Sequence, residues 1–158
     1  MGLPGAVPPV GSSRGWRVLL DWLTFGLTGS GAAWLMAQNV FATTTDFGPL
    51  APPWAARVLA IHGGVAMLFL IAVGAWLPLH VAPRLRRGAG LVSGLFQLGL
   101  LAALTITGYG LYYLAQETTR PTWSSVHWLC GLVLPTVLLF HRRRSRLPCS
   151  PLPQQEVQ

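Results

Sequence analysis

The chain has 158 residues, of which 52% are hydrophobic and only 9% are charged. Soluble domains carry roughly 25% charged residues, so a soluble fold of this size could not cover its surface with so few charges. The length is that of one domain. The composition therefore predicts a single-domain integral membrane protein.

The net charge of +7 comes from eleven arginines, since the chain has no lysine. A basic balance can indicate nucleic-acid binding. Here the arginines form short clusters that flank apolar stretches, and no basic segment alternates with aromatic residues as a single-strand-binding surface would. We therefore expect the lipid bilayer as a partner, and no nucleic acid.

Four apolar stretches are each long enough to cross a membrane, because about 20 helical residues cover the ~30 Å hydrocarbon core. They are expected at about 16–39, 54–79, 89–115 and 123–140, within a transmembrane domain over 14–141. A cleaved signal peptide is the rival interpretation of the first stretch. That stretch contains Asp21 and is too long for the apolar core of such a peptide.

The remaining segments are polar, basic or rich in Gly and Pro. Residues 1–13 lack periodicity and predict a disordered cytoplasmic lead. A Pro-bearing loop is expected over 40–53 and a tight basic turn over 80–88. Residues 142–158 are basic and then rich in Pro and Gln, which predicts a disordered cytoplasmic tail.

The arginines lie mostly on one side of such a four-span arrangement. Nine of them fall at the start of the first stretch, between the second and third, or after the fourth: Arg14, Arg17, Arg84, Arg86, Arg87, Arg142, Arg143, Arg144 and Arg146. The opposite side holds only Arg57 and Arg120. Cytoplasmic loops carry the excess of positive charge. The sequence thus predicts an all-α, four-helix transmembrane bundle with both termini in the cytoplasm.

The four histidines lie near the ends of two of these stretches. His62 lies in the second stretch and His80 directly follows it, and His127 and His141 stand in the same way to the fourth stretch. Ionisable side chains within a bilayer are costly, so they indicate a function by default. With four spans, the second and fourth run in the same direction. Each histidine would then share a membrane face with one histidine of the other stretch.

Haem iron takes two axial ligands on opposite sides of the porphyrin plane, and imidazole is a common one. Helical bundles build such sites from side chains on facing helices. The natural pairs are His62 with His127, and His80 with His141, which predicts one or two non-covalent haem b groups. The rise between histidines is ~27 Å on the second stretch and ~21 Å on the fourth. Thr105 and Thr107 on the third stretch are candidate hydrogen-bond donors to the ligands.

Other interpretations of the histidines stay open. Each could be a structural residue near a membrane interface, where side chains keep a polar tip in water. A proton relay would call for a carboxylate in mid-bilayer, and zinc or copper would need about four converging ligands. Cys130 and Cys149 are expected ~28 Å apart and form neither a CxxC nor a CxxCH motif, which excludes a zinc ribbon and a c-type haem.

Several residues of the second half carry a resemblance to a known group. They are Ser93-Gly94, Thr107-Gly108-Tyr109, Leu111-Tyr112-Tyr113, Glu117, Arg120, Ser125, His127-Trp128, Gly131-Leu132, Leu134-Pro135 and His141, with His62-Gly63-Gly64 and His80 in the first half. With these residues the chain resembles the small four-helix membrane proteins of the bacterial cytochrome b561-like or DUF4405-like group. The resemblance covers about two thirds of the chain, and its most specific part is the pattern from His127 to His141.

The resemblance implies a multi-pass protein of the bacterial inner membrane that holds haem by transmembrane histidines. His62, His80, His127 and His141 would be the axial ligands. The protein would pass electrons between membrane redox partners, such as a quinone and a redox partner protein. It would be an electron-transfer subunit rather than a self-contained enzyme. The alternative function is that of a cofactor-free accessory or assembly subunit, packed through its many glycines.

Overall fold

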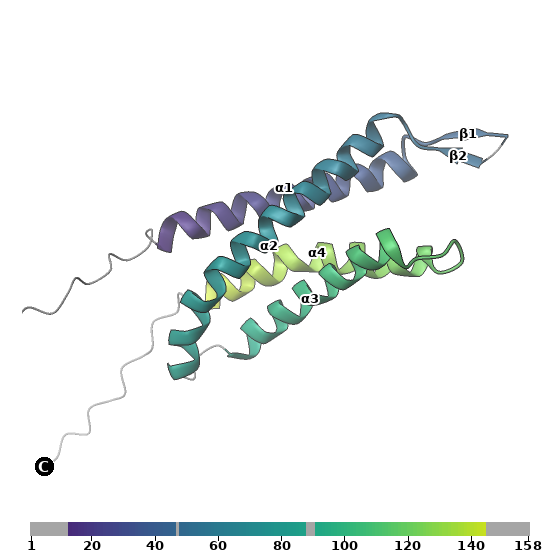
Figure 1. Ribbon diagram of the computed structural model, residues 1–158. Helices are drawn as coiled ribbons and strands as arrows, with labels where there is room; N and C mark the ends of the chain where they lie inside the picture. Colours follow the sequence, from purple (N-terminus) through teal and green to yellow (C-terminus); the bar gives the residue numbers. More distant parts are fainter. Residues whose placement is uncertain (1–12, 47, 88–90, 145–158) are drawn as a thin grey trace, which may run out of the picture. The chain divides into compact units, whose positions relative to one another are not determined.

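The computed structural model describes residues 13–46, 48–87 and 91–144, with the side chains of 13, 80–87, 91 and 144 outside the description. Within these residues the chain is mostly helical and forms four helices (Figure 1): α1 (Ser13–Asn39), α2 (Trp54–Arg87), α3 (Leu91–Tyr113) and α4 (Arg120–Arg144). The chain divides into two units, residues 1–88 and 89–158. Each unit contains one helical hairpin.

Three of the helices contain segments that are long and apolar enough to cross a membrane: Trp54–Leu79 in α2, Val92–Tyr113 in α3 and Arg120–Arg143 in α4. Helix α1 has 27 residues, which is also long enough. It is less apolar, because Asp21 and several Ser, Thr and Gly residues interrupt its hydrophobic side chains. The membrane character of the protein therefore rests on α2, α3 and α4.

Helix α2 continues past the end of the predicted second span. It runs to Arg87, so most of the basic turn expected over 80–88 is helical instead. Leu and Arg are good helix formers, and the first glycine after Gly74 is Gly88. The lead expected over 1–13 and the tail expected over 142–158 lie almost entirely outside the described residues.

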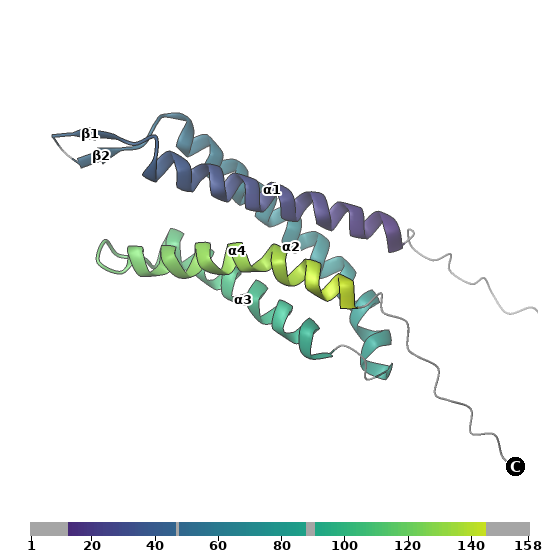
Figure 2. The same cartoon turned by 180° about the vertical axis from the view of Figure 1, so that it is seen from behind.

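In the first unit, α1 and α2 lie side by side and antiparallel (Figures 1 and 2). Small residues at their contact, Ala37 and Ala55, are almost completely buried, which lets the two backbones approach closely. The connecting segment contains a hairpin that the sequence did not predict, formed by β1 (Thr43–Thr45) and β2 (Gly48–Leu50). The strands pair antiparallel, and Gly48 has a φ of 108° at the turn, a conformation that favours glycine.

In the second unit, α3 and α4 also pack as an antiparallel pair (Figure 2). The ring of Trp123 lies directly against the backbone of Gly110, where a Cβ atom would come within 2.5 Å of it. Two turns deeper along the pair, Gly131 faces the side chain of Leu104. A glycine of each helix, Gly110 in α3 and Gly131 in α4, thus permits the two helices to approach closely.

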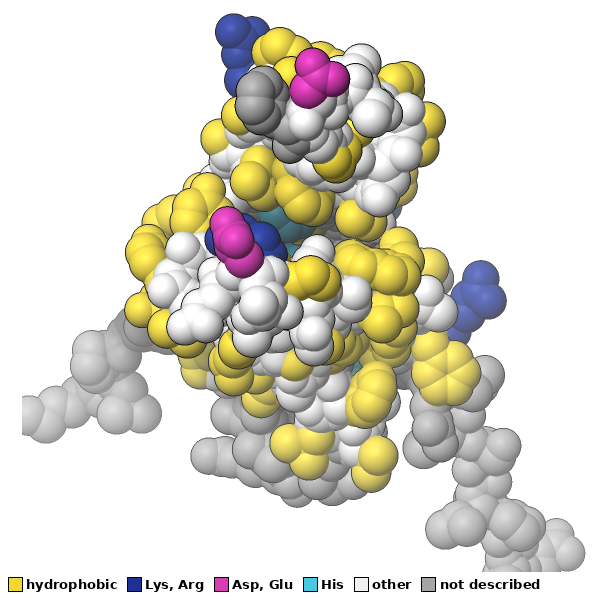
Figure 3. Space-filling view, turned by 90° about the vertical axis from the view of Figure 1, so that its right-hand side faces the viewer, with side chains coloured by type: hydrophobic (Ala, Val, Ile, Leu, Met, Phe, Trp, Pro, Cys, Tyr) yellow, Lys and Arg dark blue, Asp and Glu magenta, His cyan; other side chains and the backbone are white. Residues whose placement is uncertain are grey.

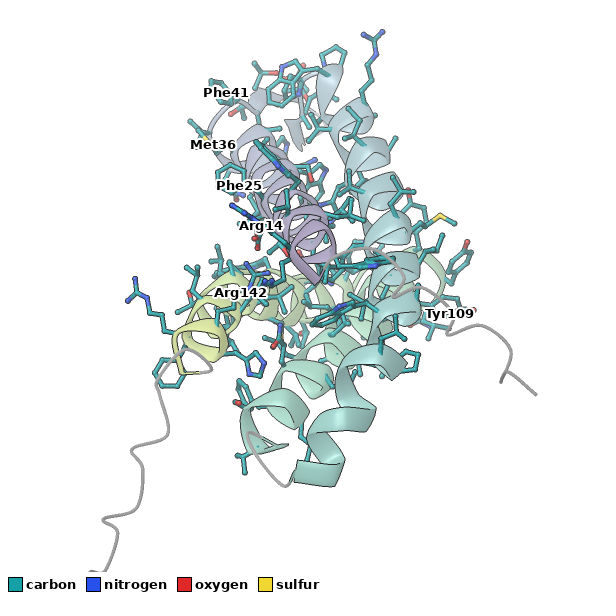
Figure 4. All side chains as sticks on the ribbon, turned by 90° about the vertical axis from the view of Figure 1, so that its left-hand side faces the viewer. Arg14, Phe25, Met36, Phe41, Tyr109 and Arg142 are labelled. Carbon is teal, nitrogen blue, oxygen red and sulfur yellow. The ribbon has the colours of Figure 1, made fainter. Side chains whose placement is uncertain are left out.

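Many large apolar side chains are exposed, and on the face seen in Figure 3 apolar side chains are widespread while charged ones are sparse. On α1, Phe25 and Met36 point away from α2 (Figure 4) and are 77% and 50% exposed. Val92 on α3 is 84% exposed. Exposed apolar surface of this extent marks contact with a membrane or with other apolar partners, as expected of a chain with membrane-crossing helices.

Candidate functional site

His127 on α4 is held by two consecutive residues of α3. Its Nδ1 atom is hydrogen-bonded to Oγ1 of Thr107 at 2.9 Å. The backbone of Gly108 lies against the other part of the ring, since a Cβ atom there would be 3.3 Å from Cε1 of His127. Thr107 is buried, with 7% of its surface exposed, and the imidazole is half-buried.

His62 on α2 has the same surroundings in the first unit. Its Nδ1 atom is hydrogen-bonded to Oγ of Ser30 on α1 at 3.0 Å. A Cβ atom at Gly31 would lie 3.3 Å from its Cε1 atom and 3.6 Å from its Nδ1 atom. The imidazole is again half-buried. Both histidines lie within the segments that are apolar enough to cross a membrane.

The two hairpins therefore repeat one local arrangement. In each, the first helix presents a hydroxyl residue followed by glycine, and the second helix places the Nδ1–Cε1 edge of a histidine on that dipeptide. The hydroxyl supplies a hydrogen-bond partner within an apolar contact, where an unpaired polar group would be costly. The glycine leaves the space that the ring occupies.

His141 and His80 differ from this arrangement. Nδ1 of His141 is hydrogen-bonded to Oγ of Ser93 at 2.9 Å, but among the described residues no side chain lies within 4 Å of a Cβ built on Gly94, so His141 does not make the glycine contact. His141 is followed by Arg142 and Arg143 at the end of α4. His80 lies within α2, but its side chain is outside the described residues.

The hydroxyl partners were only partly foreseen in the sequence. Thr107 contacts His127 as expected of a ligand-orienting residue, whereas the hydroxyl of Thr105 donates to the carbonyl of Leu101 at 2.9 Å on the exposed side of α3. Ser30 was not singled out. The signal that could have identified it is the dipeptide Ser30-Gly31, which matches Thr107-Gly108 in the second hairpin.

An open hollow of about 250 Å³ adjoins this arrangement in the second unit. It is lined by Thr107, Thr122, Trp123 and Val126.

The polar partners of the two imidazoles fit what a haem ligand requires. Across the described ranges, no three His, Cys, Asp or Glu side chains come together as a multi-ligand ion site would require. Haem iron can bind a single imidazole on each face of the porphyrin. The second nitrogen of a ligating imidazole characteristically has a polar hydrogen-bond partner. His62 and His127 each provide an imidazole with such a partner.

Comparisons with protein-family models, with curated proteins and with solved structures each gave no match. The similarity to the cytochrome b561-like or DUF4405-like group accordingly stays a prediction that rests on the residues quoted above.

Proposed function

We propose that the protein is a membrane b-type cytochrome-like protein that transfers electrons between redox partners, with His62 and His127 as axial ligands of a non-covalent haem b. The observation that carries this proposal is the shared setting of the two rings, each hydrogen-bonded through Nδ1 to a hydroxyl and seated on a glycine. When bound, haem would supply the reversible one-electron chemistry of its iron. The chain's part is to hold the imidazoles and to keep the surroundings apolar.

The proposed setting is the inner membrane of a bacterium, crossed four times with both termini in the cytoplasm. Three helices that are apolar enough to cross support it, together with the concentration of arginines in the first turns of α1, around residues 84–87 and from the last turn of α4 onward. The fourth crossing, by α1, rests on its length and on its antiparallel packing against α2.

His80 and His141 are proposed as the ligands of a second haem nearer the cytoplasm. The support for this pair is weaker, since it consists of the Ser93–His141 hydrogen bond and the sequence pattern. A quinone or a redox partner protein would exchange electrons with the haem. We therefore place the chain among electron-transfer subunits rather than self-contained enzymes.

One observation favours the alternative, a cofactor-free accessory or assembly subunit. The same hydrogen bonds link two helices in each unit, Ser30 to His62 and Thr107 to His127. Interhelical hydrogen bonds of this kind stabilise membrane helix pairs by about 0.6 kcal/mol on average. Histidines that serve only this purpose would need no haem.

Absorption spectroscopy of the full chain, purified from cells with an ample haem supply, separates the two functions. The proposal predicts a Soret band that shifts on reduction with dithionite and that is weakened or lost in the variants His62→Ala and His127→Ala. A colourless preparation would favour the cofactor-free subunit, and a band that both variants retain unchanged would contradict haem ligation by His62 and His127.

A further inference from the structure

The hydroxyl of Thr107 donates its single proton to the backbone of its own helix. Oγ1 lies 2.7 Å from the carbonyl oxygen of Ala103 and 3.2 Å from that of Leu104, which are acceptors without a proton to give. Oγ1 must therefore donate along α3, as hydroxyls within helices commonly do. Toward Nδ1 of His127, at 2.9 Å, it can then only accept, whereas a donor role was expected of Thr107 from the sequence.

The hydroxyl of Ser30 has the same pattern of hydrogen bonds in the first hairpin. Its Oγ lies 2.6 Å from the carbonyl oxygen of Gly26 and 3.1 Å from that of Leu27. The hydroxyl proton is again taken by the backbone. The hydrogen bond between Ser30 and His62, at 3.0 Å, therefore runs from the ring nitrogen to the hydroxyl oxygen.

From these directions we propose that Ser30 and Thr107 are positioning residues, which fix His62 and His127 in the tautomer protonated at Nδ1. In a neutral imidazole one nitrogen carries the proton and the other the lone pair. The lone pair, which is the group that ligates a metal, is thereby assigned to Nε2 in both rings. The tautomer assignment is inferred from the hydrogen bonds to Ser30 and Thr107, whereas its use by haem rests on the proposed function.

A second consequence concerns the haem. A ligating imidazole that donates through its other nitrogen is more basic, and so binds the oxidised iron more strongly. Removal of the acceptor hydroxyl should therefore raise the midpoint potential. Matched controls exist on the same helices, because the hydroxyls of Thr28 and Thr105 also donate to the carbonyl four residues earlier, Thr24 and Leu101 respectively.

The tautomer is tested without haem, by ¹⁵N NMR of the full chain labelled at histidine and produced in cells with haem synthesis blocked. Single-histidine replacements assign the signals. We expect Nδ1 protonated and Nε2 unprotonated in both His62 and His127, a loss of this preference at His127 in Thr107→Val, and its retention in Thr107→Ser and Thr105→Val. Protonation at Nε2 in either ring of the unmodified chain, or equal spectra for Thr107→Val and Thr105→Val, would overturn the proposal.

The effect on haem is tested by redox titration of the loaded protein. Thr107→Val and Ser30→Ala should raise the midpoint potential, whereas Thr105→Val and Thr28→Val should leave it unchanged and Thr107→Ser should restore it. If haem is bound and the potentials of all these variants agree, the positioning role is refuted while the proposed function stands. If the unmodified chain binds no haem, the proposed function fails, and the NMR result alone decides the tautomer.

Discussion

The imidazole of His127 meets α3 along one edge, with the hydroxyl of Thr107 at Nδ1 and the backbone of Gly108 near Cε1. These two contacts do different things. The hydrogen bond selects an orientation and a protonation state, whereas the glycine sets how near the ring can come to the neighbouring helix. Around His62, Ser30 makes the corresponding hydrogen bond and Gly31 allows the corresponding close approach.

We predict that Thr107 and His127 stabilise the second hairpin jointly. A double-mutant cycle with Thr107→Val and His127→Ala, measured on the unfolding of the protein in detergent, should give a coupling free energy of about 0.6 kcal/mol and at most ~1.7 kcal/mol, the range of interhelical hydrogen bonds in membranes. The same cycle with Thr105→Val in place of Thr107→Val should give none. Additive effects in the first cycle would argue against the hydrogen bond.

A second prediction concerns Gly110, on which the Trp123 ring lies. A Cβ atom at this position would meet the ring at 2.5 Å, so Gly110→Ala should destabilise the α3–α4 hairpin by about 1–3 kcal/mol, the usual cost of overpacking. Gly99→Ala on the same helix meets nothing within 4 Å. It should be neutral or slightly stabilising, since Ala favours helix over Gly. Equal thermal denaturation midpoints for the two variants would contradict this packing.

Helices α2, α3 and α4 were predictable because each contains a long, predominantly apolar segment with few charged residues. The extension of α2 to Arg87 was missed, since a polar basic segment containing Pro83 reads as a turn although its Leu and Arg residues favour helix. The β1–β2 hairpin was missed for a related reason. Pro49 argues against a strand, but it is tolerated in a short two-stranded edge.

The hydroxyl partners of the histidines could not be derived from one helix alone. Which Ser or Thr meets a given histidine depends on the register between two helices, and that register is set by small contacts such as Gly26 against Val65. Thr107 was one of two neighbouring candidates, and Ser30 one of several hydroxyl residues in α1. The pairing of His62 with His127 stays a prediction from the sequence pattern.

The third prediction is that α1 crosses the membrane. It is tested by finding on which side of the membrane the start of α1 lies. In a chain with Cys130→Ala and Cys149→Ser, single cysteines at Gly15, Thr44 and Arg143 can be labelled with a membrane-impermeant thiol reagent in spheroplasts. We expect labelling at position 44 in intact spheroplasts, and at 15 and 143 only after lysis. Labelling at 15 and 44 under the same conditions would mean that α1 does not cross.

For the protein as one redox unit, the two histidine pairs are expected to differ in importance. His141 lacks the close contact with a glycine backbone that both His62 and His127 make. We therefore predict that His141→Ala retains haem at the His62–His127 pair, whether or not a second haem is lost. The haem-to-protein ratio of the purified variant checks this. A complete loss of haem in His141→Ala would instead make the cytoplasmic pair the principal site.

Electron paramagnetic resonance of the oxidised protein, recorded in the His141→Ala background so that only one complete histidine pair remains, tests most directly whether His62 and His127 ligate one iron. We predict the low-spin signal of iron with two imidazole ligands, and its replacement by a high-spin signal or its loss when either His62→Ala or His127→Ala is added. A high-spin signal before those changes, or a low-spin signal that survives both of them, would contradict the proposed ligation.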